Sequence, residues 1–184
     1  MSISSEGLGN DGRSRLLPRD DSGREGSRHW RQRVDTRLGE LVPPEHQDPS
    51  PLHRAMRYSL LAGGKRIRPV LTIQVATDLG AAVDDVLDVA CAVEMVHTAS
   101  LILDDLPCMD DSSLRRGRPA NHLAFGEDTA ILAATALLNR AFGVIAECDR
   151  LPAQTRLLLA KAFSSKRESR ALSLGSRISK EAFI

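Results

Sequence analysis

The stretch that decides the fold runs from Val83 to Asp111 and reads VDDVLDVACAVEMVHTASLILDDLPCMDD. The part before the first aspartate pair carries apolar residues at helical spacing, which predicts a long helix. Pro107 disfavours the helical conformation of Leu106, so the helix should end near Asp105. The apolar positions form a broad face, which is typical of a helix inside a bundle. The sequence therefore predicts a central helix that ends in a cluster of carboxylates.

The end of this helix is crowded with like charge. The charged residues there are Asp104, Asp105, Asp110 and Asp111, followed by Arg115 and Arg116. Acids at a helix C-terminus face the negative pole of the helix dipole, which disfavours each by about 0.3–1 kcal/mol. Mg2+ reverses this effect, since it takes oxygen ligands from one or two carboxylates and from a substrate's phosphates. The cluster therefore predicts a site for Mg2+ and a polyanion; the alternative is a solvated acidic loop bridged to Arg115, Arg116 and Arg118.

A second anion position is predicted upstream. Gly63 and Gly64 precede three basic residues at the start of a helix, and flexible backbone with positive charge suits a phosphate. His97 lies on the same helical face as Asp104, about 10 Å along the axis. Each feature alone is weak, because basic loops are common and a lone helical histidine is more often a core or boundary residue. Together they place one anion at Asp104, Asp105 and Asp110, and another at Lys65, Arg68, His97 and one of Arg115 or Arg116.

The rest of the chain also has helical patterns, without the alternation that is typical of strands. Helices are expected at about 30–42, 51–62, 67–79 and 127–149, and from about 153 onward. The predicted fold class is all-α. Three regions are expected: a disordered N-terminal tail at 1–28, a helical domain at 29–163, and a divergent, poorly structured tail at 164–184. Phosphate-binding positions inside an apolar bundle favour substrates with phosphate heads and apolar tails.

Composition narrows the range of functions. A formal net charge of +1 and an aromatic content of 3% argue against a nucleic-acid partner. Three scattered cysteines without CxxC spacing favour a reduced, cytoplasmic protein without a structural zinc site. No secretory signal is visible, and the most apolar run, at 130–138, is too short to cross a bilayer. A cytoplasmic protein with no transmembrane segment is therefore expected.

Several motifs stand in the order and spacing of a known family. They are GGKRIRP at 63–69, EMVHTASLILDD at 94–105, DDLPCMDD at 104–111, LRRGRPANH at 114–122 and FGE at 125–127. On these motifs the chain resembles the trans-prenyltransferases, the all-α isoprenyl diphosphate synthases, over about 30–163. The sequence from Cys91 to Asp149 is similar to that of the bacterial geranylgeranyl diphosphate synthases of carotenoid pathways in particular. The resemblance implies the N-terminal half of an isoprenoid-synthase-type helical bundle.

The resemblance also implies roles for the charged residues. Asp104 and Asp110, supported by Asp105, would hold Mg2+ on an allylic diphosphate, which Arg115 would also bind; these four are the expected catalytic residues. The diphosphate of isopentenyl diphosphate would be bound by Lys65, Arg68, His97 and Arg116. The allylic C–O bond would ionise, the isopentenyl double bond would attack the carbocation, and a proton would pass to the departing pyrophosphate. The expected reaction is a head-to-tail condensation that converts farnesyl to geranylgeranyl diphosphate.

In this family the length of the product depends on side chains just upstream of the first aspartates. Ala99 and Ser100 stand there, and both are small. The resemblance therefore implies room for a product longer than farnesyl diphosphate. The equally weighted alternative is that both residues are simply small packing residues of the helix.

The sequence departs from the family pattern in its last part. The family's second DDxxD motif is missing, and no aspartate follows Asp149. The chain is therefore expected to be truncated or disrupted, and three readings stay open: an active synthase, an inactive gene fragment, or a non-catalytic partner subunit. The resemblance implies a homodimer or association with a full-length homologue. A terpene cyclase is disfavoured, since it has no isopentenyl diphosphate to bind.

Overall fold

The computed structural model describes residues 22–165. The elements in chain order are α1 (Ser22–Leu41), α2 (Ser50–Leu60), α3 (Ile67–Asp78), α4 (Val83–Asp104), β1 (Leu114–Arg115), β2 (Arg118–Pro119), α5 (Asn121–Phe125) and α6 (Glu127–Ala146). Residues 153–165 are again helical. The predicted all-α class is confirmed, because the only sheet in the described part is one hairpin of two-residue strands.

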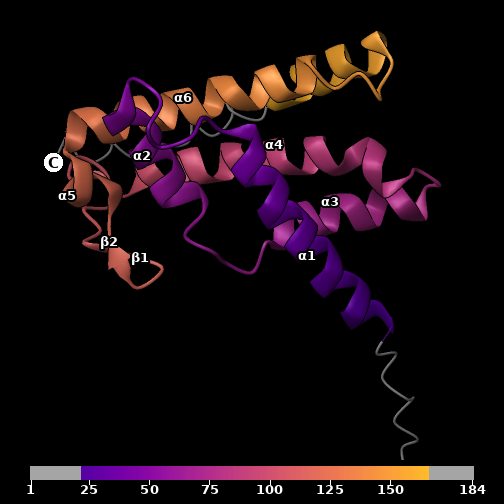
Figure 1. The fold of residues 1–184 in the computed structure, drawn as a ribbon, viewed down its shortest axis with the longest axis horizontal. Helices are drawn as coiled ribbons and strands as arrows, with labels where there is room; N and C mark the ends of the chain where they lie inside the picture. The colour runs from indigo at the N-terminus through magenta and orange to yellow at the C-terminus, as the bar shows by residue number, and fades with distance from the viewer. Residues whose placement is uncertain (1–21, 166–184) are drawn as a thin grey trace, which may run out of the picture.

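Helices α4 and α6 form the centre of the fold and lie side by side, running in opposite directions (Figure 1). The face of α6 toward the core consists of buried residues at helical spacing: Ala130, Ala133, Ala134, Leu137, Ala141, Val144 and Ile145. Four of these are alanines, which allow two helix backbones to approach closely and favour the helical state. Helix α3 packs on α4, and α2 packs on α6.

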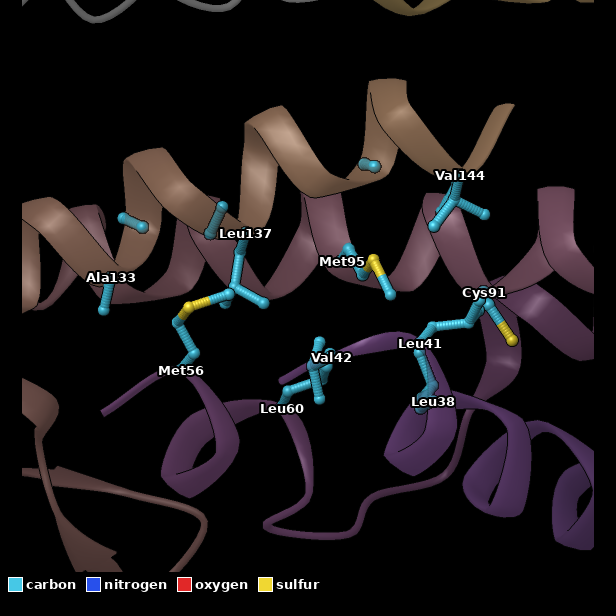
Figure 2. Close-up of a cluster of buried hydrophobic side chains, with 14 of the residues drawn as sticks. Leu38, Leu41, Val42, Met56, Leu60, Cys91, Met95, Ala133, Leu137 and Val144 are labelled. Carbon is cyan, nitrogen blue, oxygen red and sulfur yellow. The ribbon is translucent and has the colours of Figure 1, made fainter. Parts of the chain in front are cut away.

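The core joins residues from five helices: Figure 2 labels side chains of α1, α2, α4 and α6, and α3 adds Ile73. Leu38 of α1, Met56 of α2, Met95 of α4 and Leu137 of α6 are all almost completely buried. Burial of one such side chain stabilises the fold by roughly 1.5–3 kcal/mol relative to leaving it exposed. The core therefore fixes the position of α4, whose C-terminal end carries the aspartates.

Two described helices, α4 and α6, are long and apolar enough to cross a membrane by length and composition alone. The same test is passed by core helices of soluble proteins, and these two pack against each other at the centre of the fold. Packing in the core therefore explains part of their apolar character, and α6 is longer and more apolar than the run at 130–138 indicates from the sequence.

The helix boundaries agree with the predicted ones for α2, α3 and α4 and differ elsewhere. Helix α1 begins at Ser22 rather than near Trp30, so part of the expected tail is helical. The residues before Trp30 lack an apolar period, but extending an existing helix costs far less than nucleating one. Helix α6 ends at Ala146 rather than near Asp149. The expectations of a disordered N-terminal tail and a poorly structured C-terminal tail fall largely on residues 1–21 and 166–184, which lie outside the described residues.

The hairpin and α5 were not predicted. Each strand has two residues, too few to show an alternating pattern. The turn between them has Arg116 at φ 54° and Gly117 at φ 75°, and two positive φ angles are the requirement of a type I′ turn. Arginine is unusual at the first central position of a type I′ turn, where asparagine, aspartate or glycine is preferred, so the sequence did not indicate a turn. Helix α5 has five residues, below the length at which periodicity is informative.

Helix α3 carries an exposed apolar stripe. It consists of Ile67, Leu71, Val75 and Leu79, each at least half exposed. The spacing of four residues places them along one side of the helix. This stripe is the most regular apolar surface among the described residues, and the opposite side of α3 contributes Ile73 to the core.

Truncating a core residue of α6 is expected to destabilise the fold much more than truncating an exposed one. Leu137 is 0% exposed and Leu132, on the same helix, is 59% exposed. Leu137→Ala should lower the free energy of unfolding by about 2–5 kcal/mol, because it leaves a cavity. Leu132→Ala should change it by no more than about 0.5 kcal/mol. Urea unfolding followed by circular dichroism checks both, and equal losses would contradict the packing described above.

Candidate functional site

The acidic half of the site is built by the last turn of α4 and the loop after it. Asp105 caps the helix and is buried, Asp104 is half-buried, and Asp110 is exposed. The backbone N–H of Asp110 donates to the carbonyl of Asp104 at 2.9 Å, and that of Asp111 donates to the carbonyl of Leu106 at 3.1 Å. The loop therefore folds back on the helix end, and it brings the backbones of Asp104 and Asp110 into contact.

Asp105 is paired with an arginine. Its carboxylate is 2% exposed and accepts hydrogen bonds from Arg115 Nε at 3.0 and 3.1 Å, with a further bond from Nη2. The hydrogen bond that Arg115 donates to Asp105 raises the pKa of the Arg115 guanidinium; burial opposes this shift, and the charges of Asp104 and Asp110 add to it. Asp105 therefore holds Arg115 beside the acidic loop.

The hairpin carries both predicted arginines and is attached to α2. Tyr58 donates its hydroxyl hydrogen to the carbonyl of Pro119 at 3.0 Å, and the guanidinium of Arg118 lies 4.0 Å from the centre of the Tyr58 ring. Such cation–π contacts contribute about 0.5–1 kcal/mol at exposed sites. The hairpin is thus attached to α2 through Arg118 and Pro119, and Arg115 pairs with Arg118 across the two strands, directly before the turn that carries Arg116.

Arg116 lies against the paired glycines. Its Nη1 donates to the carbonyl of Gly63, and its Nη2 lies 3.6 Å from Glu94 Oε1. A Cβ atom at Gly64 would stand 3.0 Å from the guanidinium carbon, so only glycine fits without displacing the arginine. Burial lowers the pKa of Arg116, and nearby Arg66 lowers it further while Glu94 opposes the shift. An arginine remains charged despite such a shift.

Two more predicted anion-binding residues meet on the open side of α4. Arg68 Nη1 lies 3.1 Å from His97 Nε2, which joins the first turn of α3 to α4. Lys65 is exposed and lines a shallow groove between α1 and α3 with Arg28 and Arg31. The structure therefore brings Arg68 and His97 into contact and places Lys65 in a neighbouring groove.

Sequence reasoning missed the residues beneath this cluster. Arg66, with φ 50°, is 1% exposed and donates to Glu94 at 2.8 Å, to Asp35 at 2.7 Å and to the carbonyl of Leu60 at 2.8 Å. Both Arg66 and Glu94 were within the quoted motifs but had no assigned role. The available signal was Glu94 itself, a charged residue surrounded by Val93, Met95 and Val96 on an apolar helix.

The donor set can be compared with the requirements of Mg2+. Within residues 22–165 no three His, Cys, Asp or Glu side chains are grouped closely enough to hold a metal ion alone. Mg2+ needs only one or two carboxylates when phosphates complete its shell. Asp104 and Asp110 stand next to each other through a backbone hydrogen bond, whereas the carboxylate of Asp105 is paired with Arg115. The residues fit an ion that is shared with a diphosphate.

The two residues predicted to set product length differ in their surroundings. Ala99 is buried in the core, and Ser100 is half-buried with its hydroxyl donating to the carbonyl of His97 at 2.8 Å. Of the two, Ser100 is the less enclosed. Their effect on product length stays a prediction.

The acidic loop also carries a thiol. Cys108 is exposed, whereas Cys91 and Cys148 are buried. Burial raises the pKa of the Cys91 thiol to about 12 and also raises that of Cys148. Because the thiolate is the reactive form, the two buried cysteines should be inert near neutral pH. Cys108 is therefore a selective reporter of the loop that joins Asp104 to Asp110.

Two similar proteins are named as geranylgeranyl diphosphate or pyrophosphate synthases. A geranylgeranyl diphosphate synthase of Pantoea ananas is 60% identical over 120 residues, covering 64% of this chain and 39% of that protein. A heterodimeric geranylgeranyl pyrophosphate synthase large subunit 1 of Arabidopsis thaliana is 58% identical over 109 residues, covering 59% of this chain and 29% of that protein.

The solved structure of an FPP/GFPP synthase from Zymomonas mobilis superimposes with a TM-score of 0.74 at 34% identity, covering 78% of this chain and 52% of that one. The chain thus spans about half the length of these relatives or less. The family model described as polyprenyl synthetase matches residues 49–172, which include both halves of the site. The chain belongs to the polyprenyl synthetase family.

Proposed function

We propose that this chain supplies the first-aspartate half of a prenyl diphosphate synthase, which condenses isopentenyl diphosphate with an allylic diphosphate. The observation that carries the proposal is the placement of two neighbouring arginines. Arg115 is held by Asp105 beside the acidic loop. Arg116 is held between Gly63 and Glu94, beside the paired-glycine loop that leads to the basic cluster, defined here as Lys65, Arg68 and His97. This placement supports two neighbouring anion subsites, which a reaction between two diphosphates requires.

The proposed mechanism assigns the residues to two substrates. Asp104 and Asp110 would hold Mg2+, which when bound neutralises charge on the allylic diphosphate. Arg115 would donate hydrogen bonds to the same diphosphate and stabilise the charge that develops as its C–O bond breaks. The isopentenyl diphosphate would be fixed by Lys65, Arg68, His97 and Arg116, with its double bond facing the carbocation. The proton released after attack would pass to the departing pyrophosphate.

The finer assignments belong to the same proposal. Farnesyl diphosphate is the proposed allylic substrate and geranylgeranyl diphosphate the product, supported by the name of the Pantoea relative. A role in carotenoid synthesis and a cytoplasmic location go with that assignment. The packing of α4 and α6 in the core supports the location, since neither helix is then needed in a membrane.

A second candidate role is that of a partner subunit that contributes its half of the fold to a homologue. The apolar stripe of α3, formed by Ile67, Leu71, Val75 and Leu79, favours this role, because exposed apolar stripes mark contact surfaces. One similar protein is named as the large subunit of a heterodimeric synthase. In this role, as in that of an inactive fragment, the chain alone forms no product.

Removal of the metal or its ligands is expected to abolish turnover. The purified chain, alone and mixed with a full-length homologue whose own aspartates are substituted, is incubated with Mg2+, labelled isopentenyl diphosphate and farnesyl diphosphate. Labelled product should form in one of the two reactions and disappear in EDTA. Asp104→Asn and Asp110→Asn should each lower the rate by roughly 100-fold, as expected for the loss of charge stabilisation in the transition state.

Asp111→Asn is the matched control, because Asp111 is exposed, has φ 48°, and asparagine tolerates that conformation. It should leave the rate nearly unchanged. The absence of product from both reactions, or an equal loss in all three variants, would contradict the proposed activity.

Binding of a metal–diphosphate complex should protect Cys108. Near pH 8 an excess of a thiol reagent should modify Cys108 alone, because the raised pKa values of Cys91 and Cys148 keep those thiols protonated. All three thiols should react in guanidinium chloride. Mg2+ with inorganic pyrophosphate should slow the reaction of Cys108 severalfold, and pyrophosphate in EDTA should not. Equal protection with and without Mg2+ would argue against a cation-bridged anion at this loop.

A further inference from the structure

Glu94 is a buried charge that the assigned roles do not use. Its side chain is 3% exposed and lies in the middle of α4, whose neighbouring residues are apolar. A carboxylate in such surroundings is strongly disfavoured unless charged partners compensate for the lost water. Its presence therefore needs an explanation in terms of its partners.

The partners of Glu94 are two arginines in different situations. Arg66, at 2.8 Å, is 1% exposed and also donates to Asp35 and to the carbonyl of Leu60. Arg116, at 3.6 Å, is 23% exposed and reaches the surface of the basic cluster. Glu94 is thus closer to the buried arginine, whose charge it shares with Asp35. The longer contact leaves much of the positive charge of Arg116 available to an anion.

Arg116 has little else to hold it in place. Its backbone stands at φ 54°, a conformation that disfavours non-glycine residues. Its other polar contact is the carbonyl of Gly63, in a flexible paired-glycine loop. Among the residues that the structure describes, Glu94 is the only carboxylate within ion-pair distance of its guanidinium. Without Glu94 this side chain would keep one polar contact, with the neutral carbonyl of Gly63.

We infer that Glu94 is a positioning residue for the second diphosphate subsite, which fixes Arg116 in the orientation that receives a phosphate. The inference rests on the proposed function of the basic cluster. Glu94 does not touch the substrate in this account; it acts through Arg116. Its other contact, with Arg66 at the N-terminal end of α3, anchors it between α3 and α4, so the arginine is held by two helices of the fold.

The experiment measures binding without turnover. The full chain is titrated with isopentenyl diphosphate in EDTA by isothermal calorimetry, so the acidic loop cannot bind through Mg2+. Glu94→Gln should weaken this binding by about tenfold, the effect of misplacing one charge-assisted hydrogen bond. Binding of farnesyl diphosphate in Mg2+ should stay within about twofold of the unaltered chain, because it depends on the other subsite. A residue of merely structural importance would weaken both.

Asp35→Asn is the matched control. It removes the carboxylate at the opposite end of the same series of ion pairs, 2.7 Å from Arg66, without touching Arg116. Isopentenyl diphosphate should bind this variant within about twofold of the unaltered chain. A double-mutant cycle adds Arg116→Gln, and Glu94→Gln should cause no further loss in that background, because its effect requires the arginine.

Glu94→Gln leaves Arg66 without its buried partner, so folding is checked by circular dichroism. If that variant unfolds, Arg66→Met combined with Glu94→Gln removes both buried charges and takes its place, since replacing a buried pair is tolerated better than breaking it. Equal binding by the unaltered chain and the folded variant would overturn the role of Glu94 alone. A failure of the unaltered chain to bind isopentenyl diphosphate would overturn the proposed subsite and the inference with it.

Discussion

The close packing of α4 against α6 is the interaction on which the rest of the structure depends. The alanines of α6 let the two backbones approach, and the larger residues Leu137 and Met95 fill the space beside them. Because α4 is held along its whole length, its C-terminal end has a defined position and direction. The acidic loop follows that end directly, and the hairpin is attached to it through the ion pair of Arg115 with Asp105. Helix α3 packs on the same helix.

Much of this fold could be predicted from the sequence, because its signals are long and repeated. Helices α2, α3 and α4 have broad apolar faces with glycine or proline at their ends, and their boundaries follow those signals. The hairpin and α5 are too short to carry a period, and the arginine in the turn gives no hint of a hairpin. The first residues of α1 could not be predicted as helical, because a polar extension of a helix has no apolar periodicity.

The sequence indicated which charged residues make up the candidate site, but it did not indicate which of them form ion pairs with each other. Spacing alone places Asp104 and Asp110 near the end of one helix, and in the structure their backbones are in contact there. It could not indicate that Asp105 is buried against Arg115, because that contact depends on how the hairpin folds back. Arg66 and Glu94 were hidden for a related reason: their pairing joins residues far apart in the chain. Breaking such a buried pair costs about 3–5 kcal/mol, so these residues shape the site and also constrain the fold.

The hairpin has a consequence for how the two subsites respond to each other. Arg115 and Arg116 are joined by one peptide bond, yet they are held by different carboxylates of α4, Asp105 and Glu94. A ligand that draws one guanidinium away from its carboxylate shifts the backbone that carries the other. The two binding equilibria are then thermodynamically linked, and the linkage is reciprocal: each anion alters the affinity for its neighbour by the same factor. The two-residue turn of the hairpin would in this way couple the two proposed anion subsites.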